Sequence, residues 1–270
     1  MKRLLALNML PASGGTIVSR YLASRGWLLN SEIHPYANRS SDTFCPNKFS
    51  DILITQIEAG LGASMDTRLF RQKSFLTEIE LSIEIAEFYN KPLALRCWHH
   101  PNFTQDEPLL SDSVSQVIAT SQIIRLSELV VVRNPIDNYL SFIKNADWAK
   151  YVSAPDALDQ FMKRYLCFVE FYAKRKATFI TYEEFCTRPE DFLHIACDLA
   201  QHDEQQLVEI PISKIKMSGA SGRQSDTIEV RPREKLNYDV EKKLNESIFY
   251  RKIISLLPCY EEKAITTGAD

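Results

Sequence analysis

The sequence predicts an α/β fold, with a central and mostly parallel sheet flanked by helices. Short, continuous apolar runs alternate with stretches in which apolar residues recur every three or four positions. Such runs are typical of strands buried on both faces, as in parallel sheets covered by helices on each side. A chain of 270 residues is long enough for one sizeable core. We therefore expect a single domain over residues 1–270.

The first half of the chain begins with the run RLLALNML, residues 3–10, which predicts a strand. A helix is expected over 16–25, where Ile17, Val18, Tyr21 and Leu22 lie on one side. WLLN, 27–30, is a second short strand that ends in the polar turn SEIHPY. Residues 31–50 are rich in Ser, Asn, Asp and Pro and predict a long loop.

Two helical patterns follow, KFSDILITQIEAG and TRLFRQKSFLTEIELSIEIAEFYN, which we expect to form a helical insertion at about 46–90. KPLALRCW, 91–98, is the third expected strand, and 128–132 is the fourth. The remaining elements are a helix after Pro135, a helix at 155–175, a fifth strand in ATFITY (177–182), and helices at 183–200 and 238–256. The stretch 213–237 between the last two helices is polar, basic and irregular.

Composition excludes several classes of function. The net charge of −3 provides no global field for a nucleic acid, so an anionic ligand requires a local group of arginines. The six cysteines show no CxxC spacing and no paired His ligands, so we expect no metal site and a reduced, cytoplasmic location. The N-terminal MKRLLALNMLPAS is interpreted as the first strand rather than a signal peptide, and no apolar run approaches the ~20 residues of a membrane span.

The stretch NMLPASGGTIVSR, residues 8–20, predicts an anion-binding turn. The backbone amides of such a turn and the start of the following helix attract phosphate oxygens. Gly14 and Gly15 allow a close backbone approach, and the Thr16 hydroxyl can donate a hydrogen bond. The turn is not a Walker A motif, because it lacks the lysine. The alternative is a Gly-rich connection that binds nothing.

A second motif is VVVRNPIDNYLS, residues 130–141. The strand end delivers Arg133, Pro135 takes the favoured first position of a helix, and Ser141 follows two turns later. A guanidinium and a hydroxyl on one face suit a phosphate. The alternative is that Arg133 pairs with Asp137 at the start of the helix.

Together these motifs resemble the sulfotransferases that use 3′-phosphoadenosine 5′-phosphosulfate (PAPS). In that family a P-[KR]-[ST]-G-[GT]-T turn holds the 5′-phosphosulfate, and R-[ND]-P-x-D-x-x-x-S holds the 3′-phosphate. Two later segments are similar to the family as well: FITYEEFCTRPEDFLHIACDLA (179–200), and SGASGRQSDTIEVRPR (218–233), which resembles the basic loop over the nucleotide.

The resemblance implies a P-loop-like sulfotransferase fold, PAPS as the sulfonate donor, 3′-phosphoadenosine 5′-phosphate (PAP) as the product, and no metal. The cofactor-binding residues that it implies are Ala12, Ser13, Gly14, Gly15, Thr16, Arg133, Ser141, Tyr182, Gly222 and Arg223.

The sequence departs from the family at Ala12, where the family has Lys or Arg. That cation contacts the sulfonate, and fixed positive charge is usually the largest catalytic contribution. Arg96, at the end of the third expected strand, is the preferred substitute, since many relatives have a cation there. Arg20, one turn into the first helix, is the second choice.

Sulfonyl transfer also needs a base to take the proton of the acceptor. In the cytosolic-type enzymes of the family a His after the third strand serves, which gives His99 and His100 here. In the trehalose-sulfotransferase type a Glu after the second strand serves, which gives Glu32, with His34 nearby. The alternatives are a pair of exposed loop histidines and a solvated carboxylate. We favour Glu32 slightly.

Three functions are consistent with the sequence. The first is a sulfotransferase acting on a hydroxyl or amine of a small-molecule, glycan or lipid acceptor. The second is a phosphoryl-transfer enzyme of the P-loop class, for which neither the lysine nor a clear Mg²⁺ site is present. The third, suggested by Ala12, is a PAP-binding relative without catalysis. The sequence predicts neither the acceptor nor the oligomeric state.

Overall fold

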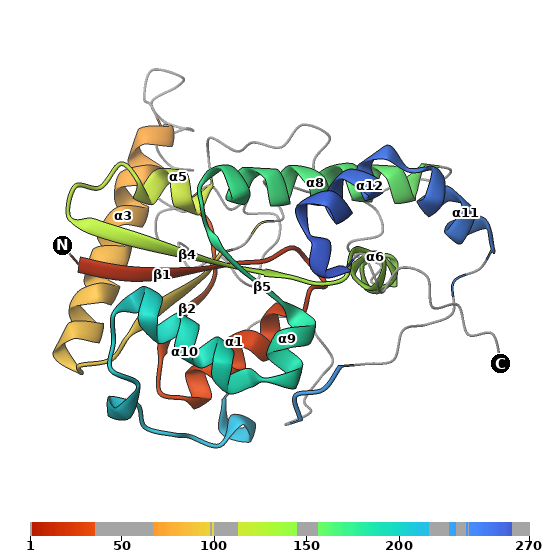
Figure 1. The fold of residues 1–270 in the computed structure, drawn as a ribbon. Helices are drawn as coiled ribbons and strands as arrows, with labels where there is room; N and C mark the ends of the chain where they lie inside the picture. Colours follow the sequence, from red (N-terminus) through yellow and green to blue (C-terminus); the bar gives the residue numbers. More distant parts are fainter. Residues whose placement is uncertain are drawn as a thin grey trace.

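The protein is built on a five-stranded sheet in which every neighbouring pair of strands is parallel, in the order β2-β3-β1-β4-β5 (Figure 1). The computed structural model describes residues 2–35, 67–97, 99, 113–144, 156–215, 227–230, 236 and 238–260. The strands are β1 (Lys2–Asn8), β2 (Leu28–Ile33), β3 (Leu93–Cys97), β4 (Ile124–Val132) and β5 (Thr178–Thr181). The expected α/β class is confirmed.

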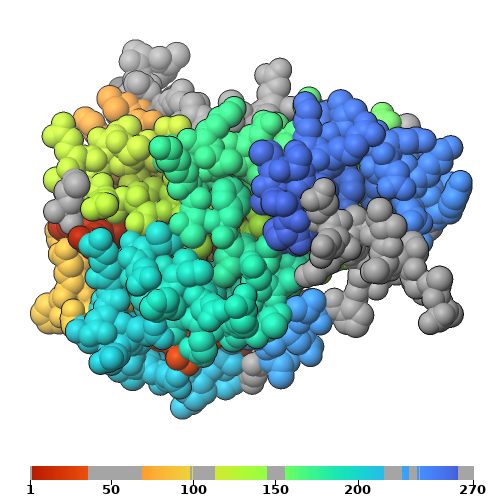
Figure 2. Space-filling model, in the orientation of Figure 1, coloured from red at the N-terminus to blue at the C-terminus, as the bar shows by residue number. Residues whose placement is uncertain are grey.

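Helices cover both faces of the sheet (Figure 1). One face carries α3 (Thr67–Phe88), α5 (Val114–Ile118), α8 (Ala157–Lys174) and α12 (Ile248–Leu256). The other carries α1 (Gly15–Ser24), α9 (Tyr182–Thr187) and α10 (Pro189–Ala200). The chain also forms α6 (Pro135–Ile143), α11 (Tyr238–Glu246) and short 3-10 turns at Glu204–Gln206, Ile212–Lys214 and Pro258–Tyr260. In the filled view these helices leave little of the sheet visible (Figure 2).

The central strand β1 explains why both faces need covering. Leu5 and Leu7 pack among the residues of the α1 face, whereas Leu4 and Ala6 pack among those of the α3 face. All four are buried, because successive side chains of a strand point to opposite faces. A continuous apolar run is therefore the pattern that a central parallel strand requires.

Several element boundaries differ from the sequence-based expectation because of pairing and capping. β2 continues to Ile33, through the predicted polar turn, because it pairs with β3 up to that residue. β4 begins at Ile124, since it pairs with the whole of β1. The expected helix 183–200 is two helices, with Pro189 starting the second. The helix 238–256 is likewise divided where Ser247 caps α12.

The range 46–90, expected as a helical insertion, lies only partly within the described residues. Its second part is α3, which connects β2 to β3 and buries Phe75 and Ile79 against the sheet. α3 is thus the crossover helix of a βαβ unit. Residues 46–66 lie outside the described residues. Among the helices that the structure describes, none is long and apolar enough to cross a membrane.

The topology places a switch point at the carboxyl ends of β1 and β4. The chain leaves β1 toward β2 through α1 on one face, and leaves β4 toward β5 through α8 on the other face. Open α/β sheets bind ligands at such a switch point. A ligand site is therefore expected at the residues that follow these two strands, 9–16 and 133–134.

Candidate functional site

The turn after β1 is closed by its own serine. Both the Ser13 amide and the Ser13 hydroxyl donate to the Leu10 carbonyl, at 3.3 and 2.5 Å. Ala12 and Gly14 have positive φ angles of 66° and 92°. That conformation costs an alanine roughly 1–2 kcal/mol, so the rest of the structure must hold the turn in place. Ser13 thereby serves the shape of the turn in this structure.

The turn presents three backbone amides at the start of α1. Within the described residues, the amides of Gly14, Gly15 and Thr16 donate to no backbone carbonyl. No side chain among the described residues caps the helix, and its first turn contains no acidic residue. By contrast, Asn134 caps α6 and Thr181 caps α9. An uncapped helix N-terminus with open amides has the electrostatics that favour an anion.

Both glycines of the turn are closely packed. A Cβ atom on Gly14 would overlap the ring of Tyr182. A Cβ atom on Gly15 would overlap the sulfur of Met9 and lie 3.4 Å from Nε of Arg96. Gly15 therefore lets the Arg96 guanidinium approach the backbone of the turn.

Arg133 reaches the turn from the end of β4. Its Nη1 donates to the Ala12 carbonyl at 3.0 Å, and its guanidinium lies 5.4 Å from the centre of the Tyr182 ring. The Tyr165 hydroxyl donates to the Arg133 carbonyl at 2.6 Å. Asn138 Nδ2 donates to the Pro11 carbonyl at 2.8 Å. The two segments that the sequence analysis singled out are thus bonded to each other.

The Glu183 carboxylate fixes the start of α6 through two hydrogen bonds. One of its carboxylate oxygens accepts the Asn134 amide at 3.1 Å, and the other accepts the Tyr260 hydroxyl at 2.8 Å. The side chains of Thr181 and Glu184 form a capping box that starts α9. The segment 182–184 therefore places the Tyr182 ring against the turn and the Glu183 carboxylate within hydrogen-bond distance of the Asn134 amide.

Arg96 and Glu32 form an ion pair beside Thr16. Arg96 Nη2 lies 2.9 Å from Glu32 Oε1, and the two side chains are only 12% and 15% exposed. The guanidinium also donates to the hydroxyls of Thr16 and Ser31, each at 3.4 Å. The preferred substitute for the missing lysine thus contacts the anion-binding turn.

A β-bulge produces the ion pair. The β2–β3 register shifts between Ser31 and Ile33, and Glu32 between them has a φ angle of 57°. The extra residue of a bulge re-aims its side chain. Burial lowers the pKa of Arg96, and the negative charge of Glu32 opposes that shift. A buried guanidinium of this kind is stabilised by a nearby anion.

His99 occupies a different environment, in the core on the other side of the sheet. It is 1% exposed, and its Nε2 lies 3.0 Å from Asn8 Oδ1 and 3.2 Å from the Tyr172 hydroxyl. Tyr172 belongs to α8, whereas Arg96 contacts α1 on the opposite face. His99 is therefore a buried histidine and not an exposed loop residue.

Arg20, the second choice for the cation, supports the fold. It is buried, and its guanidinium donates to the carbonyls of Ile212 and Ile215 at 2.8 and 3.2 Å. These bonds hold the segment that leads out of Ile212–Lys214 against α1. Ser141 lies partly buried on α6. The predicted residues His100, Gly222 and Arg223 lie outside the described residues.

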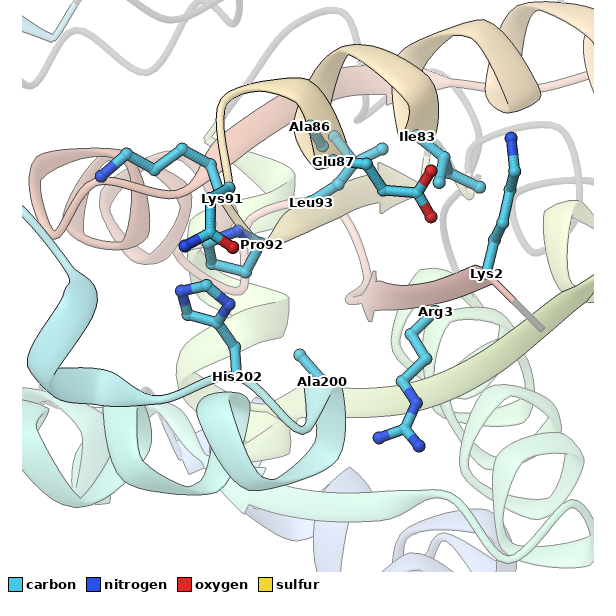
Figure 3. Close-up of a pocket in the computed structure, with 11 residues that line it drawn as sticks. Lys2, Arg3, Ile83, Ala86, Glu87, Lys91, Pro92, Leu93, Ala200 and His202 are labelled. Carbon is cyan, nitrogen blue, oxygen red and sulfur yellow. The ribbon is translucent and has the colours of Figure 1, made fainter.

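A hollow of about 270 Å³ lies at the amino ends of β1 and β3. Its lining includes Lys2, Arg3, Lys91, His202 and Glu87. Figure 3 shows that the charged ends of Lys2, Arg3 and Lys91 point in different directions. These basic groups do not converge on one point, so the hollow lacks the geometry of an anion site.

Fold and geometry together define an α/β protein with a glycine turn and two arginines at its switch point. No family model and no curated protein matches the sequence. Several solved structures match at low sequence identity, and three of them are described as sulfotransferases. The first is a sulfotransferase domain from the curacin biosynthetic pathway, at 15% identity and a TM-score of 0.48, covering 94% of this chain and 96% of the other.

The second is a sulfotransferase domain from the Synechococcus PCC 7002 olefin synthase, at 14% identity and a TM-score of 0.43, covering 74% of each chain. The third is a sulfotransferase from Alicyclobacillus acidocaldarius, at 9% identity and a TM-score of 0.46, covering 94% of each chain. At this level of similarity, what the chain does must be inferred from its own site.

The sequence analysis missed the residues that fix the site. Asn138, Tyr165 and Glu183 bond the backbone of the two motifs, and Met9 fills the space beside Gly15. Asn138 could have been found, because it lies inside the RNPxDxxxS motif. Met9 lies in the glycine-turn stretch and Glu183 in the segment 179–200, whereas Tyr165 carries no local signal, since its partner Arg133 is 32 positions away.

Proposed function

We propose that the protein is a sulfotransferase that moves a sulfonate from PAPS to a hydroxyl or amine of a small-molecule, glycan or lipid acceptor. The observation that carries the proposal is the uncapped start of α1, whose three open amides have Arg96 at one end of the turn and Arg133 at the other. These are the segments that resemble the PAPS-binding motifs of the family.

The residues present fit such a ligand. The amides of Gly14, Gly15 and Thr16 would hold the 5′-phosphosulfate, and Arg133 with Ser141 would hold the 3′-phosphate. One N–H group of Arg133 donates to the Ala12 carbonyl, and a guanidinium has five N–H donors in all. PAPS, when bound, supplies the activated sulfonate. Arg96 would supply the positive charge that Ala12 does not.

Glu32 is the base that we propose. The bulge and the ion pair hold its carboxylate 2.9 Å from Arg96, on the α1 side of the sheet where the turn lies. A carboxylate fixed there can accept the proton of an acceptor hydroxyl. His99 is a weaker candidate, because its Nε2 is engaged in the core with Asn8 and Tyr172. His100 remains an alternative.

Calorimetric titration with PAP tests the proposal. We expect micromolar binding to the wild type and a loss of at least about 30-fold in affinity for Arg133→Ala, since a charge-assisted contact of this kind contributes roughly 2–5 kcal/mol. Arg125→Ala is the matched control, because Arg125 is an exposed arginine of the same strand. Absence of PAP binding by the wild type would refute the proposal, and ATP with Mg²⁺ would then test phosphoryl transfer.

Ala12 favours a second candidate, a PAP-binding protein without catalysis. The two are separated by transfer from labelled PAPS to a panel of hydroxyl and amine acceptors. Product that disappears in Arg96→Ala supports the enzyme. Tight PAP binding without product from any acceptor class supports the binding protein.

A further inference from the structure

A buried tyrosine from the turn that follows α12 reaches the end of β4. Tyr260 belongs to the 3-10 turn Pro258–Tyr260, and its side chain is buried. Its hydroxyl lies 2.8 Å from a carboxylate oxygen of Glu183 and 3.2 Å from the Val132 carbonyl oxygen. These two partners are 77 and 128 positions away in the sequence. The contact therefore ties the segment after α12 to the strand end that carries Arg133.

The two residues between β4 and α6, Arg133 and Asn134, are both held through their backbone. The Arg133 carbonyl accepts a hydrogen bond from the Tyr165 hydroxyl at 2.6 Å. The Asn134 amide donates at 3.1 Å to the Glu183 carboxylate, whose other oxygen is the one that Tyr260 contacts. Tyr260 thus contacts the backbone before Arg133 and, through Glu183, fixes the amide after it.

The link from Tyr260 to Glu183 is a hydrogen bond to a charged acceptor in a buried position. Burial raises the pKa of Tyr260, and so do the nearby Tyr165 and the negative charge of Glu183, so the hydroxyl keeps its proton. Hydrogen bonds to a carboxylate are shorter and stronger than those between neutral groups. Removal of the hydroxyl would take a donor from this carboxylate and loosen its hold on the Asn134 amide.

We propose that Tyr260 is a positioning residue for the 3′-phosphate of the ligand. This role rests on the proposed function, in which Arg133 holds that phosphate. The Arg133 guanidinium already donates to the Ala12 carbonyl at 3.0 Å, so its remaining donors are aimed by the placement of its own backbone. A displacement of about 1 Å is enough to weaken such a contact strongly. Tyr260 would therefore set how strongly a nucleotide with a 3′-phosphate is preferred over one without it.

Calorimetric titration with PAP and with adenosine 5′-phosphate, which lacks the 3′-phosphate, tests this role. The wild type should prefer PAP by at least about 30-fold. Tyr260→Phe should reduce that preference about tenfold by weakening PAP binding, while its affinity for adenosine 5′-phosphate stays within about twofold. Glu183→Gln should reduce the preference as well, because an amide offers one acceptor oxygen to Asn134 and Tyr260 where the carboxylate offers two.

Tyr172→Phe is the matched control, because it removes a buried hydroxyl that donates to Asn8 on another strand. Its preference for PAP should equal that of the wild type. Circular dichroism and thermal melting establish which variants are folded, and Glu183→Gln decides if Tyr260→Phe is not.

The two nucleotides separate positioning from a general loss of structure. An unchanged preference in folded Tyr260→Phe would overturn the proposal, and so would equal weakening of both nucleotides. A wild type that binds PAP no better than adenosine 5′-phosphate would instead refute the proposed function itself, together with the role of Tyr260.

Discussion

The two ends of the sheet both gather basic residues, but only one end has the geometry of an anion site. At the carboxyl ends, Arg96 and Arg133 are held by backbone and side-chain contacts around one turn. At the amino ends, Lys2 and Arg3 extend in different directions (Figure 3). The difference teaches that the placement of cations around one turn, rather than their number, distinguishes the two ends.

The largest expected effect comes from removing Arg96. Arg96→Ala should lower sulfonate transfer by about 10²–10³-fold, because a fixed charge beside the reacting group is lost. The same change at Lys91, in the hollow at the other end, should have no effect. Initial rates with an acceptor identified by screening measure both, and equal effects of the two variants would contradict the comparison.

Gly14→Ala tests the shape of the turn. The substituted residue would need a φ angle of 92° and its Cβ would overlap Tyr182, so the turn must rearrange. We expect PAP affinity to fall by about 100-fold and stability by roughly 2–4 kcal/mol. Calorimetry and chemical denaturation measure these quantities. Unchanged PAP binding would show that the amides of the turn do not hold the ligand.

Tyr172→Phe tests whether the buried His99, which contacts the Tyr172 hydroxyl, contributes to transfer. The Tyr172 hydroxyl donates to Asn8 at 2.9 Å in a fully buried position, so its loss should cost about 1–2 kcal/mol of stability. PAP affinity should stay within about twofold, well below an effect of 1 kcal/mol. If transfer fell about 100-fold while the melting temperature stayed unchanged, His99 would be a catalytic residue and Glu32 would not be the sole base.

The smallest effect is expected at His202, in the hollow at the amino ends. Burial and nearby Lys91 lower the pKa of His202, while Asp203 opposes the shift. Below pH ~6.5 the unfolded chain therefore binds more protons at this residue than the folded chain, and stability falls as pH falls. The loss should stay under about 1 kcal/mol because the residue is near the surface. Denaturation curves at pH 7 and 5.5 measure this loss of stability, and His202→Gln should abolish it. A wild type that is more stable at pH 5.5 than at pH 7 would contradict the prediction.

Much of the fold follows from local sequence patterns. The apolar runs that became β1, β3 and β5 are short and continuous because each strand is covered on both faces. The sequence also places Gly14, Thr16 and Arg133 at the ends of strands, where parallel sheets bind ligands. Boundaries such as Ile33 and Ile124 could not be predicted, since they depend on pairing with a neighbouring strand.

The sequence by itself determined the class of fold, the glycine turn and the RNPxDxxxS segment, because each is encoded in consecutive residues. Only the tertiary structure decided that Glu32 faces Arg96, that Arg133 bonds the Ala12 carbonyl and that His99 lies in the core. These contacts join residues from different strands and helices. Their geometry depends on sheet register and on a β-bulge, which no local pattern specifies.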